Sequence, residues 1–263
     1  TKISEHIGHI PVVVISPSDT SLIHDSGEER RRFMNIVLSQ TDQPYLRAMQ
    51  SYNRVLQQRN KLLKSDTPPS KILLEAFSGQ LGRDAGYIHQ KRGELAAELN
   101  SLASEFYTLL SDGKESVSLE YTSDLNKGTM QELLEGSYQR DTILKYTSVG
   151  IQRDDFDFLM NGYPIKKCSS QGQQKTFLIS LKLAQLSMMR KRYGFSPILL
   201  LDDVFDKLDM KRVEQLINMV SKEGFGQLFV TDSNKVRISD LVRKLDSQSR
   251  FYTVSKGQFT EVK

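Results

Sequence analysis

Paired cysteines and long apolar runs are missing from this sequence of 263 residues. Its one cysteine, Cys168, excludes a disulfide within the chain and favours a reducing compartment, for which we expect the cytoplasm. No stretch of about 18 consecutive apolar residues is present, and a membrane-spanning helix needs one of roughly that length. We therefore expect no membrane-spanning segment and no membrane partner.

A phosphate-binding loop is missing as well. The pattern G-x-x-x-x-G-K-[ST], whose backbone amides cradle nucleotide phosphates, occurs nowhere in the 263 residues. The nearest match, residues 172–176, has one glycine and no predicted strand before it. Residues 11–15 (Pro-Val-Val-Val-Ile) predict a buried strand near the start of the sequence, and such a strand needs neighbours on both sides. From both observations we expect the chain to be the C-terminal part of a longer protein whose N-terminal segment holds the nucleotide.

A strong excess of one charge sign is also absent. The chain has 36 Lys and Arg residues and 32 Asp and Glu residues, which gives a net charge of +4. With a pI near 9.0 the chain is mildly basic, which permits a polyanionic partner without requiring one. An apolar content of 38% over this length is enough for a sizeable core, in one large domain or in two lobes.

The clearest stretch that is present lies at residues 198–203 (Ile-Leu-Leu-Leu-Asp-Asp). Four apolar residues between Pro197 and two aspartates predict a strand buried on both faces of a parallel sheet. Ligands of α/β proteins bind at the carboxyl ends of such strands. Asp202 could hold a Mg²⁺ ion, which prefers oxygen ligands, and Asp203 could orient or deprotonate an attacking water. A solvated pair of capping aspartates is the alternative that these residues leave open.

A second informative stretch, residues 170–174 (Ser-Gln-Gly-Gln-Gln), comes shortly before that strand. Ser170 is a favourable N-cap, and apolar residues at helical spacing predict a helix over residues 176–190. A polar run with one glycine at a helix start presents free backbone N–H groups to an anion. With the helix, the strand, the Asp pair and residues 206–209 (Asp-Lys-Leu-Asp) after it, the order resembles the signature motif, Walker B and D-loop of an ABC-type ATPase head.

Residues 27–113 are predicted to be mainly helical. An acidic and then basic run at residues 28–32 (Glu-Glu-Arg-Arg-Arg) suits a helix start, either as a solvated face or as a basic contact for phosphates or a partner. Residues 66–69 (Asp-Thr-Pro-Pro) interrupt the helical pattern. After them, apolar residues at 4-3-4-3 spacing are typical of a heptad seam and favour an antiparallel helical lobe. The seam consists of Ile88, Leu95, Leu99, Leu102, Phe106 and Leu109.

After Gly113, apolar and polar residues alternate, and the helical spacing of apolar residues ends. Residues 117–121 predict a strand, and residues 156–165 predict a hairpin around Asn161-Gly162. Before the hairpin, residues 150–155 (Gly-Ile-Gln-Arg-Asp-Asp) leave two interpretations open, a structural ion pair or the edge of an active site. Further on, the pattern predicts a helix at 211–222, a strand at 226–231, a helix around Leu241 and a closing hairpin at 251–262.

Several motifs stand in the order found in the RecF family of bacterial recombination-mediator ATPases, and the chain resembles that family over essentially its whole length. They are residues 15–17 (Ile-Ser-Pro), 29–33 (Glu-Arg-Arg-Arg-Phe), 58–63 (Gln-Arg-Asn-Lys-Leu-Leu), 150–155, 170–174 and 199–203. The resemblance implies an α/β fold: a partial ABC-type ATPase head, without its phosphate-loop segment, with an inserted α-helical lobe. The expected division is residues 1–27 as a remnant of ATPase lobe I, 28–146 as the mainly helical lobe II, and 147–263 as the part with the signature motif, Walker B and D-loop.

Site residues and partners follow from the resemblance, position by position. The signature residues would contact the γ-phosphate bound by the opposite protomer, and the D-loop aspartate would cross the dimer interface; these positions are Ser170, Gly172, Gln173 and Asp209. Asp202 and Asp203 match Walker B, as Mg²⁺ ligand and as the carboxylate that activates water. The resemblance implies ATP and Mg²⁺ as cofactors, an ATP-dependent homodimer on DNA and slow ATP hydrolysis. It also implies cooperation with RecR and RecO in loading recombinase at gaps or stalled forks.

Two departures from familiar patterns bear on function. RecF sequences commonly carry Pro-His before Arg-Asp-Asp, whereas Ile151 and Gln152 stand there in this chain. A transporter ATPase places its switch histidine after the strand that ends at Thr231, where this chain has Asp-Ser-Asn at 232–234. A transporter ATPase subunit is therefore disfavoured. The remaining alternative is a non-catalytic, DNA-binding structural module on the same scaffold.

Overall fold

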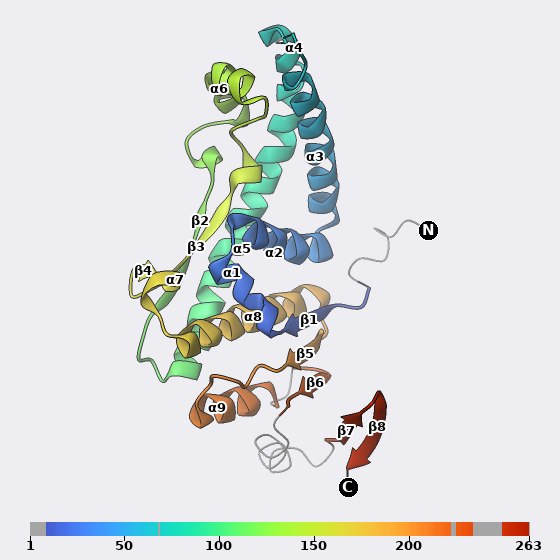
Figure 1. The fold of residues 1–263 in the computed structure, drawn as a ribbon, viewed down its shortest axis with the longest axis vertical. Helices are drawn as coiled ribbons and strands as arrows, with labels where there is room; N and C mark the ends of the chain where they lie inside the picture. Colours follow the sequence, from blue (N-terminus) through green and yellow to red (C-terminus); the bar gives the residue numbers. More distant parts are fainter. Residues whose placement is uncertain (1–8, 68, 222–224, 234–248, 263) are drawn as a thin grey trace.

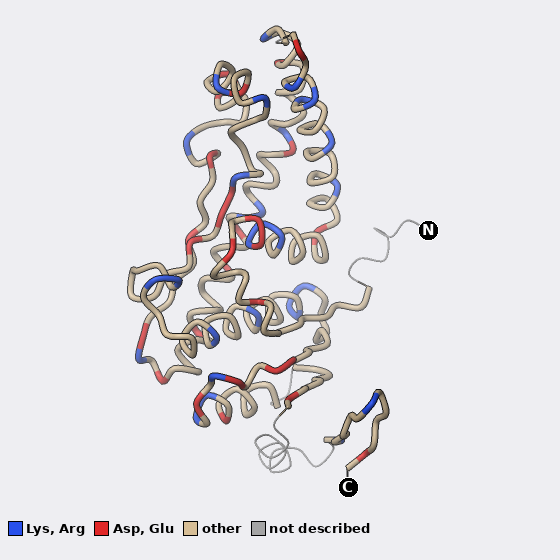
Figure 2. Tube along the Cα trace, viewed as in Figure 1, with Lys and Arg blue, Asp and Glu red and all other residues tan. Residues whose placement is uncertain are grey.

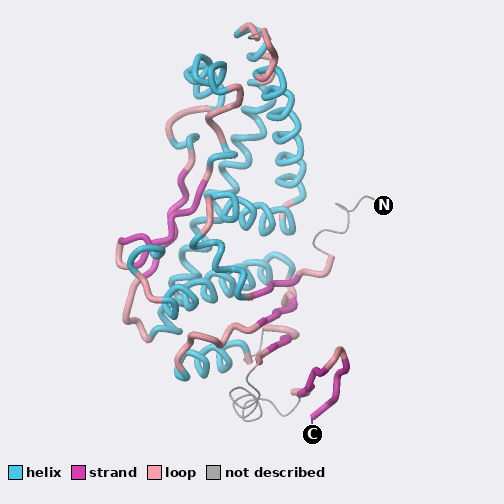
Figure 3. Tube along the Cα trace, viewed as in Figure 1, coloured by secondary structure: helices cyan, strands magenta, loops and turns pink. Residues whose placement is uncertain are grey.

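A long central helix connects two packed regions of an elongated molecule (Figure 1). The structure is a computed structural model that describes residues 9–67, 69–221, 225–233 and 249–262. Helices and strands are both present, and helices predominate (Figure 3). The mixed composition agrees with the predicted α/β class.

A parallel sheet with the strand order β1-β5-β6 lies at one end of the molecule (Figure 1). Its strands are β1 (Val12–Ile15), β5 (Ile198–Asp202) and β6 (Leu228–Thr231), and β5 pairs with both neighbours. The strands predicted at 11–15, 198–201 and 226–231 are confirmed.

Only one face of β5 is fully buried. Leu199 and Leu201 point to this face and share a core cluster with residues of α8 (Gln171–Tyr193) and α9 (Met210–Val220). Ile198 and Leu200, on the other face, stay partly exposed. The expectation that this strand is buried on both faces is therefore wrong within the part of the chain that the structure describes.

The helical region lies toward the other end of the molecule. Its helices are α1 (Ser21–His24), α2 (Gly27–Thr41), α3 (Gln43–Leu63), α4 (Lys71–Glu75), α5 (Ser78–Ser111) and α6 (Met130–Leu144). The helical character predicted for residues 27–113 and the break predicted at 66–69 are confirmed, because α3 ends before that break and α4 begins after it.

The helix α5 has 34 residues and packs against α3, α6 and α8. The predicted seam holds at Leu95 and Leu99, which are buried. Farther along, Leu109 is 52% exposed, and Tyr107 and Leu110 are buried in its place. A straight α-helix drifts by about 20° per heptad relative to a 3.5-residue seam, so the buried stripe leaves the predicted positions.

An antiparallel sheet of β2 (Val117–Thr122), β3 (Asp155–Met160) and β4 (Tyr163–Pro164) packs beside α5. Asn161 and Gly162 have positive φ angles of 50° and 81°, as a tight hairpin turn requires. The predicted strand at 117–121 and the hairpin at 156–165 are confirmed, and α7 (Ile165–Cys168) follows directly. Because β2 and β3 pair, the sheet crosses the lobe boundary expected after residue 146, and the division into lobes stays a prediction.

Short elements complete the described chain. The 3₁₀ helices η2 (Pro17–Thr20), η3 (Asp124–Asn126) and η4 (Ile151–Arg153) link larger elements. The predicted closing hairpin is confirmed as β7 (Phe251–Ser255) and β8 (Gln258–Val262). The predicted helix around Leu241 lies outside the described residues. Among the helices that are described, none is long and apolar enough to span a membrane.

Candidate nucleotide-contact site

The carboxyl end of β5 carries the two aspartates that the sequence singles out. Parallel pairing sets Asp202 beside Thr231 of β6, and the Thr231 hydroxyl donates a hydrogen bond to Asp202 Oδ1 at 2.5 Å. The strand ends there: Asp203 adopts a positive φ of 50°, and its N–H donates to the Thr231 carbonyl oxygen at 3.2 Å. Asp202 is exposed and Asp203 half-buried, so the sheet edge presents acidic side chains at the usual ligand position of an α/β protein.

Asp202 is suited to bind a magnesium ion. Mg²⁺ takes oxygen ligands, keeps several waters, and is commonly held by one or two carboxylates together with nucleotide phosphates. Thr231 engages one carboxylate oxygen of Asp202, which leaves the other for a cation. Within the described ranges, no group of three or more His, Cys, Asp or Glu side chains could hold a metal by itself. A magnesium ion held by Asp202 would therefore need further ligands from waters or from phosphate oxygens.

The N-terminus of α8 is formed by the predicted signature residues. Ser170 is the N-cap: its Oγ accepts from the N–H of Gln173 at 3.3 Å, and Gln173 Oε1 accepts from the N–H of Ser170 at 2.8 Å. This reciprocal capping box starts the helix at Gln171, before the predicted residue 176. No described residue accepts a hydrogen bond from the N–H groups of Gln171 and Gly172, which lie at the positive end of the helix dipole.

Both polar groups of the Gln173 side chain form hydrogen bonds within this chain. Besides capping Ser170, its Nε2 donates to Glu115 Oε1 at 2.8 Å. The group that this helix start offers to an anion is therefore the backbone, together with the exposed hydroxyl side of Ser170.

Contacts between α8 and the turn after β5 bring the two motifs together. Lys175 Nζ donates to the carbonyl oxygens of Asp203 at 3.2 Å and Asp206 at 2.8 Å, and burial lowers the pKa of Lys175. Gly172 lies against the same turn, where an added Cβ atom would come within 3.1 Å of the Lys207 carbonyl oxygen. The start of α8 and the turn at residues 203–207, after β5, thus form one surface.

Sequence reasoning does not single out Lys175. Lys175 is the fifth residue of α8 and lies beyond the first turn, so the helix dipole has little effect on it. Both of its hydrogen bonds join segments that are distant in sequence, so no local pattern identifies the residue.

Asp209 is the N-cap of α9. Its Oδ1 accepts from the N–H of Arg212 at 2.9 Å, and Arg212 Nη1 donates to Thr176 Oγ1 of α8 at 3.1 Å. The predicted D-loop position therefore contacts α9 directly and α8 through the side chain of Arg212. The Asp209 side chain is still exposed, as a contact with a second copy would require.

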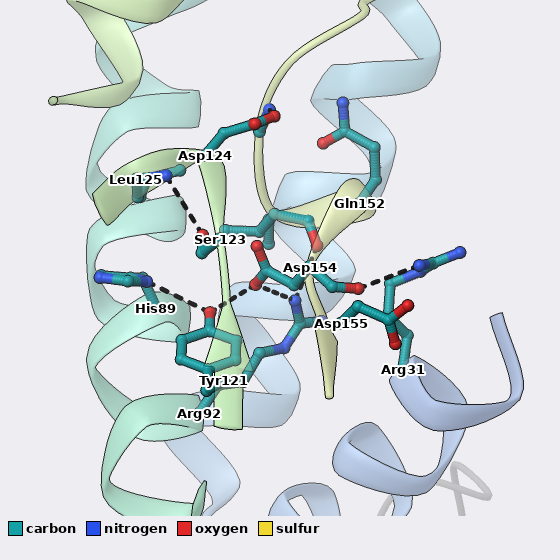
Figure 4. Close-up of polar contacts among 12 residues, drawn as sticks. Arg31, His89, Arg92, Tyr121, Ser123, Asp124, Leu125, Gln152, Asp154 and Asp155 are labelled. Carbon is teal, nitrogen blue, oxygen red and sulfur yellow. Dashed lines mark hydrogen bonds and ion pairs between the residues drawn. The ribbon is translucent and has the colours of Figure 1, made fainter. Parts of the chain in front are cut away.

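The loop at residues 150–155 contributes Asp154 to a buried ion pair with Arg92 (Figure 4). Asp154 Oδ2 accepts from Arg92 Nη1 and from the Tyr121 hydroxyl, each at 2.5 Å. Arg92 and Asp154 are 1% and 0% exposed. Burial alone would lower the pKa of Arg92, but Tyr45 and Asp154 hold it above its ordinary value. Of the two interpretations that the sequence leaves open for this loop, the structural ion pair is the one observed.

The basic run near the start of α2 is engaged with the same loop. Arg30 forms a two-pronged pair with Asp155, with distances of 2.6 and 2.9 Å, and Arg31 donates to the Asp154 carbonyl oxygen at 3.0 Å. A fully solvated face is therefore wrong for Arg30, whose guanidinium group pairs with Asp155, while a contact of this run with phosphates or a partner stays a prediction. Arg32 is exposed.

Two relatives from different bacteria carry the same name. The DNA replication and repair protein RecF of Azobacteroides pseudotrichonymphae is 44% identical over 262 residues, which cover 99% of this chain and 72% of the relative. The protein of the same name from Bacteroides fragilis is 40% identical over 262 residues, which cover 100% of this chain and 71% of the relative. The chain belongs to the RecF family. No family model matches it.

Solved structures of RecF share the fold. The recombination mediator protein RecF-ATPrS in the RecFOR pathway matches with a TM-score of 0.82 and 27% identity, over 100% of this chain and 71% of that chain. RecF-ATP gives the same TM-score, over 98% and 69%. The Smc head domain of Pyrococcus furiosus reaches a TM-score of 0.50 at 14% identity, over 95% of this chain and 61% of that one, which supports the fold alone. The predicted fold class is thereby confirmed.

One departure from common RecF sequences has a structural role in this RecF-family chain. Gln152 Oε1 accepts from the Tyr52 hydroxyl at 2.5 Å, and Gln152 Nε2 donates to the Val149 carbonyl oxygen at 2.6 Å. The amide therefore holds the 150–155 loop against α3.

Proposed function

We propose that this RecF-family protein binds ATP and Mg²⁺ between two copies of itself, and that the dimer binds DNA, hydrolyses ATP slowly, and helps to load recombinase at gaps or stalled forks. The observation that carries the proposal is the convergence of the α8 N-terminus, the Asp202–Asp203 edge and the Asp209 turn on one surface. Relatives named DNA replication and repair protein, and RecF structures named with ATP and ATPrS, support it.

Each site residue has a role that its position allows. Asp202 would hold Mg²⁺ through the carboxylate oxygen that Thr231 leaves open, and the ion would neutralise developing phosphate charge. Asp203 would orient and deprotonate the attacking water.

The contacts with the second copy would come from the helix starts. Ser170, Gly172 and Gln173 would present the α8 N-terminus to the γ-phosphate of the nucleotide held by the other copy, because free N–H groups and the helix dipole favour an anion there. Asp209 would cross the dimer interface at the start of α9.

We also propose RecR and RecO as partners and the cytoplasm as the site of action. The RecF structures that match this chain are described as belonging to the RecFOR pathway, which supports the partners. Cys168 is a free, exposed thiol, which suits a reducing compartment. None of the comparisons supports a transporter ATPase or a non-catalytic module.

Replacing the two aspartates tests the proposed chemistry in the full-length protein. Asp203→Asn keeps the size of the side chain and removes the base, so ATP binding and dimers should persist while hydrolysis falls roughly 10²-fold or more. Asp202→Asn should in addition weaken Mg²⁺-dependent ATP binding, because a metal ligand loses its charge. Steady-state hydrolysis rates, measured across titrations of ATP and Mg²⁺, separate the two effects.

Asp206→Asn is the matched control. Asp206 is an exposed aspartate of the same turn, and its contact with Lys175 is made by the backbone carbonyl, so the variant should hydrolyse ATP at nearly the wild-type rate. A wild-type rate in Asp203→Asn would contradict the role given to Asp203. A wild-type protein that neither binds ATP nor dimerises with it would contradict the proposed function.

A further inference from the structure

The helix α3 presents to solvent a face of cations and amides without acids. Between Gln43 and Leu63 it contains no Asp or Glu, although acids are nearly as frequent as bases in the chain as a whole. Its exposed cations are Arg47, Arg54 and Lys61, which recur at intervals of seven residues and are here called the α3 stripe. Exposed amides fill the spaces between them, and these are Gln50, Asn53, Gln57 and Gln58.

Helical geometry sets the α3 stripe on one line, on a side of the helix that is turned away from the core face. A step of seven residues returns a side chain to within about 20° of its starting direction and advances it by about 10 Å. Tyr45, Tyr52 and Val55 are buried in the core on the other side of the helix. Figure 2 shows Lys and Arg at intervals along α3.

The cations of the α3 stripe lack the acidic neighbours that usually neutralise Lys and Arg on a solvated helix face. On α5, for example, Lys91 pairs with Glu94 at 2.8 Å. Within the described residues, no carboxylate pairs with Arg47, Arg54 or Lys61. Three cations in a row without an ion-pair partner among the described residues favour a polyanion, because each phosphate that they neutralise releases counterions and no internal ion pair has to break.

We propose that the α3 stripe is a contact surface for the sugar-phosphate backbone of DNA. The inference rests on the proposed function, in which the dimer acts on DNA, and adds the surface that does so. The stripe is straight and about 20 Å long, and the phosphates of one DNA strand recur at about 3.4 Å along the axis, so each cation can meet a separate phosphate. Arginine, lysine and amide groups donate to phosphate oxygens without reading bases, so the interaction is independent of sequence.

The α3 stripe is remote from the nucleotide-contact site, so the two can be tested separately. Tyr45 of α3 accepts from Arg92 Nε of α5 at 3.1 Å, which places α3 along the first half of α5. Glu115, which holds Gln173 at the start of α8, follows the far end of α5. The intervening stretch of α5, from residue 92 to 111, is about 30 Å long.

The test compares two variants of the full-length protein, each of which loses three positive charges. One variant combines Arg47→Gln, Arg54→Gln and Lys61→Gln. The control variant combines Lys127→Gln, Arg140→Gln and Lys191→Gln, which are exposed cations outside α3. Binding of a labelled DNA duplex with a single-stranded tail is followed by fluorescence anisotropy, with ATP and Mg²⁺, over a series of salt concentrations.

The α3 variant should bind DNA roughly tenfold or more weakly at low salt, and the slope of log K against log salt should fall by about 0.9 for each phosphate that is no longer neutralised. The control variant should keep the wild-type slope. Arg54→Gln alone should give about a third of the change, since it removes one of the three cations. ATP-dependent dimerisation should be the same in all of these proteins.

Three results would overturn the inference. The first is an equal decrease of DNA affinity in both triple variants, because it would reveal a general charge effect. The second is wild-type DNA binding by the α3 variant together with loss of RecR or RecO binding, because the stripe would then be a surface for an acidic protein. The third, a wild-type protein that forms dimers with ATP and binds no DNA, would contradict the proposed function as well.

Discussion

At the scale of single residues, the buried pair of Arg92 and Asp154 predicts an unequal response to two similar substitutions. Both side chains are buried, so removing one charge leaves the other unpaired in a poorly polar environment. Asp154→Asn should therefore lower the free energy of unfolding by about 3–5 kcal/mol. Asp155→Asn breaks the more accessible pair with Arg30 and should cost about 1 kcal/mol or less. Urea titrations followed by far-ultraviolet circular dichroism measure both.

A double replacement serves as the control for this pair. Asp154 Oδ1 is buried and has no hydrogen-bond partner among the described residues, so the pair is not fully compensated even in the native fold. Replacing both partners, as Arg92→Met with Asp154→Leu, should then recover much of the lost stability. Equal costs for Asp154→Asn and Asp155→Asn would contradict the importance given to burial.

The same pair shows how far residue-level prediction reaches. Arg92 stands four residues after Ile88 and three before Leu95, which is a position within the buried seam. A charge at such a position requires a buried partner, and the Arg-Asp-Asp motif offers one. Which aspartate pairs with Arg92 depends on how the 150–155 loop docks on α5, and that long-range contact has no local signal.

At the scale of elements, Lys175 joins α8 to the turn that carries Asp203, and its removal should affect turnover more than ATP binding. Lys175→Met keeps a long, unbranched side chain but removes both hydrogen bonds to the turn. Because the position of Asp203 then becomes less fixed, kcat for ATP hydrolysis should fall roughly tenfold, while KM changes little. Steady-state kinetics of the full-length protein give both constants.

Two further variants make that measurement specific. Lys182→Met removes a partly buried lysine of the same helix that pairs with Asp19 at 2.8 Å, and it should leave kcat unchanged. Lys175→Arg keeps a donor at the end of the side chain and should recover part of the rate. A rise in KM with unchanged kcat would show that Lys175 acts on ATP binding instead of on the turn after β5.

Elements with strong local signals could be predicted from the sequence, and those that depend on packing could not. The apolar run at 198–201, the N-cap Ser170 and the Asn161-Gly162 turn each have a local cause, and all three predictions are confirmed. The partial exposure of Leu200 and the drift of the α5 seam past Leu109 depend on what packs against each face. The hydrogen bonds of Lys175 likewise join segments that approach only in the folded chain.

At the scale of the whole molecule, the exposed N-terminus of α8 predicts ATP-driven association of two copies. Ser170→Arg places a bulky side chain where the nucleotide of the other copy would dock. Loss of the N-cap costs only about 1 kcal/mol, so the full-length variant should fold and should still bind ATP. Dimerisation should be lost, and DNA binding and turnover should fail with it. Light scattering in the presence of ATP and Mg²⁺ measures the association.

The substitution Ser170→Thr separates a steric effect at the interface from damage to the helix start. Threonine retains a capping hydroxyl, so α8 should begin at the same place and the protein should dimerise with ATP. Loss of dimers in both variants would mean that the helix start itself cannot tolerate change, whereas loss in Ser170→Arg alone supports a shared nucleotide site. Normal dimerisation of Ser170→Arg on ATP would contradict the role of the α8 N-terminus, and the proposed function would then lack the interaction that links ATP to association.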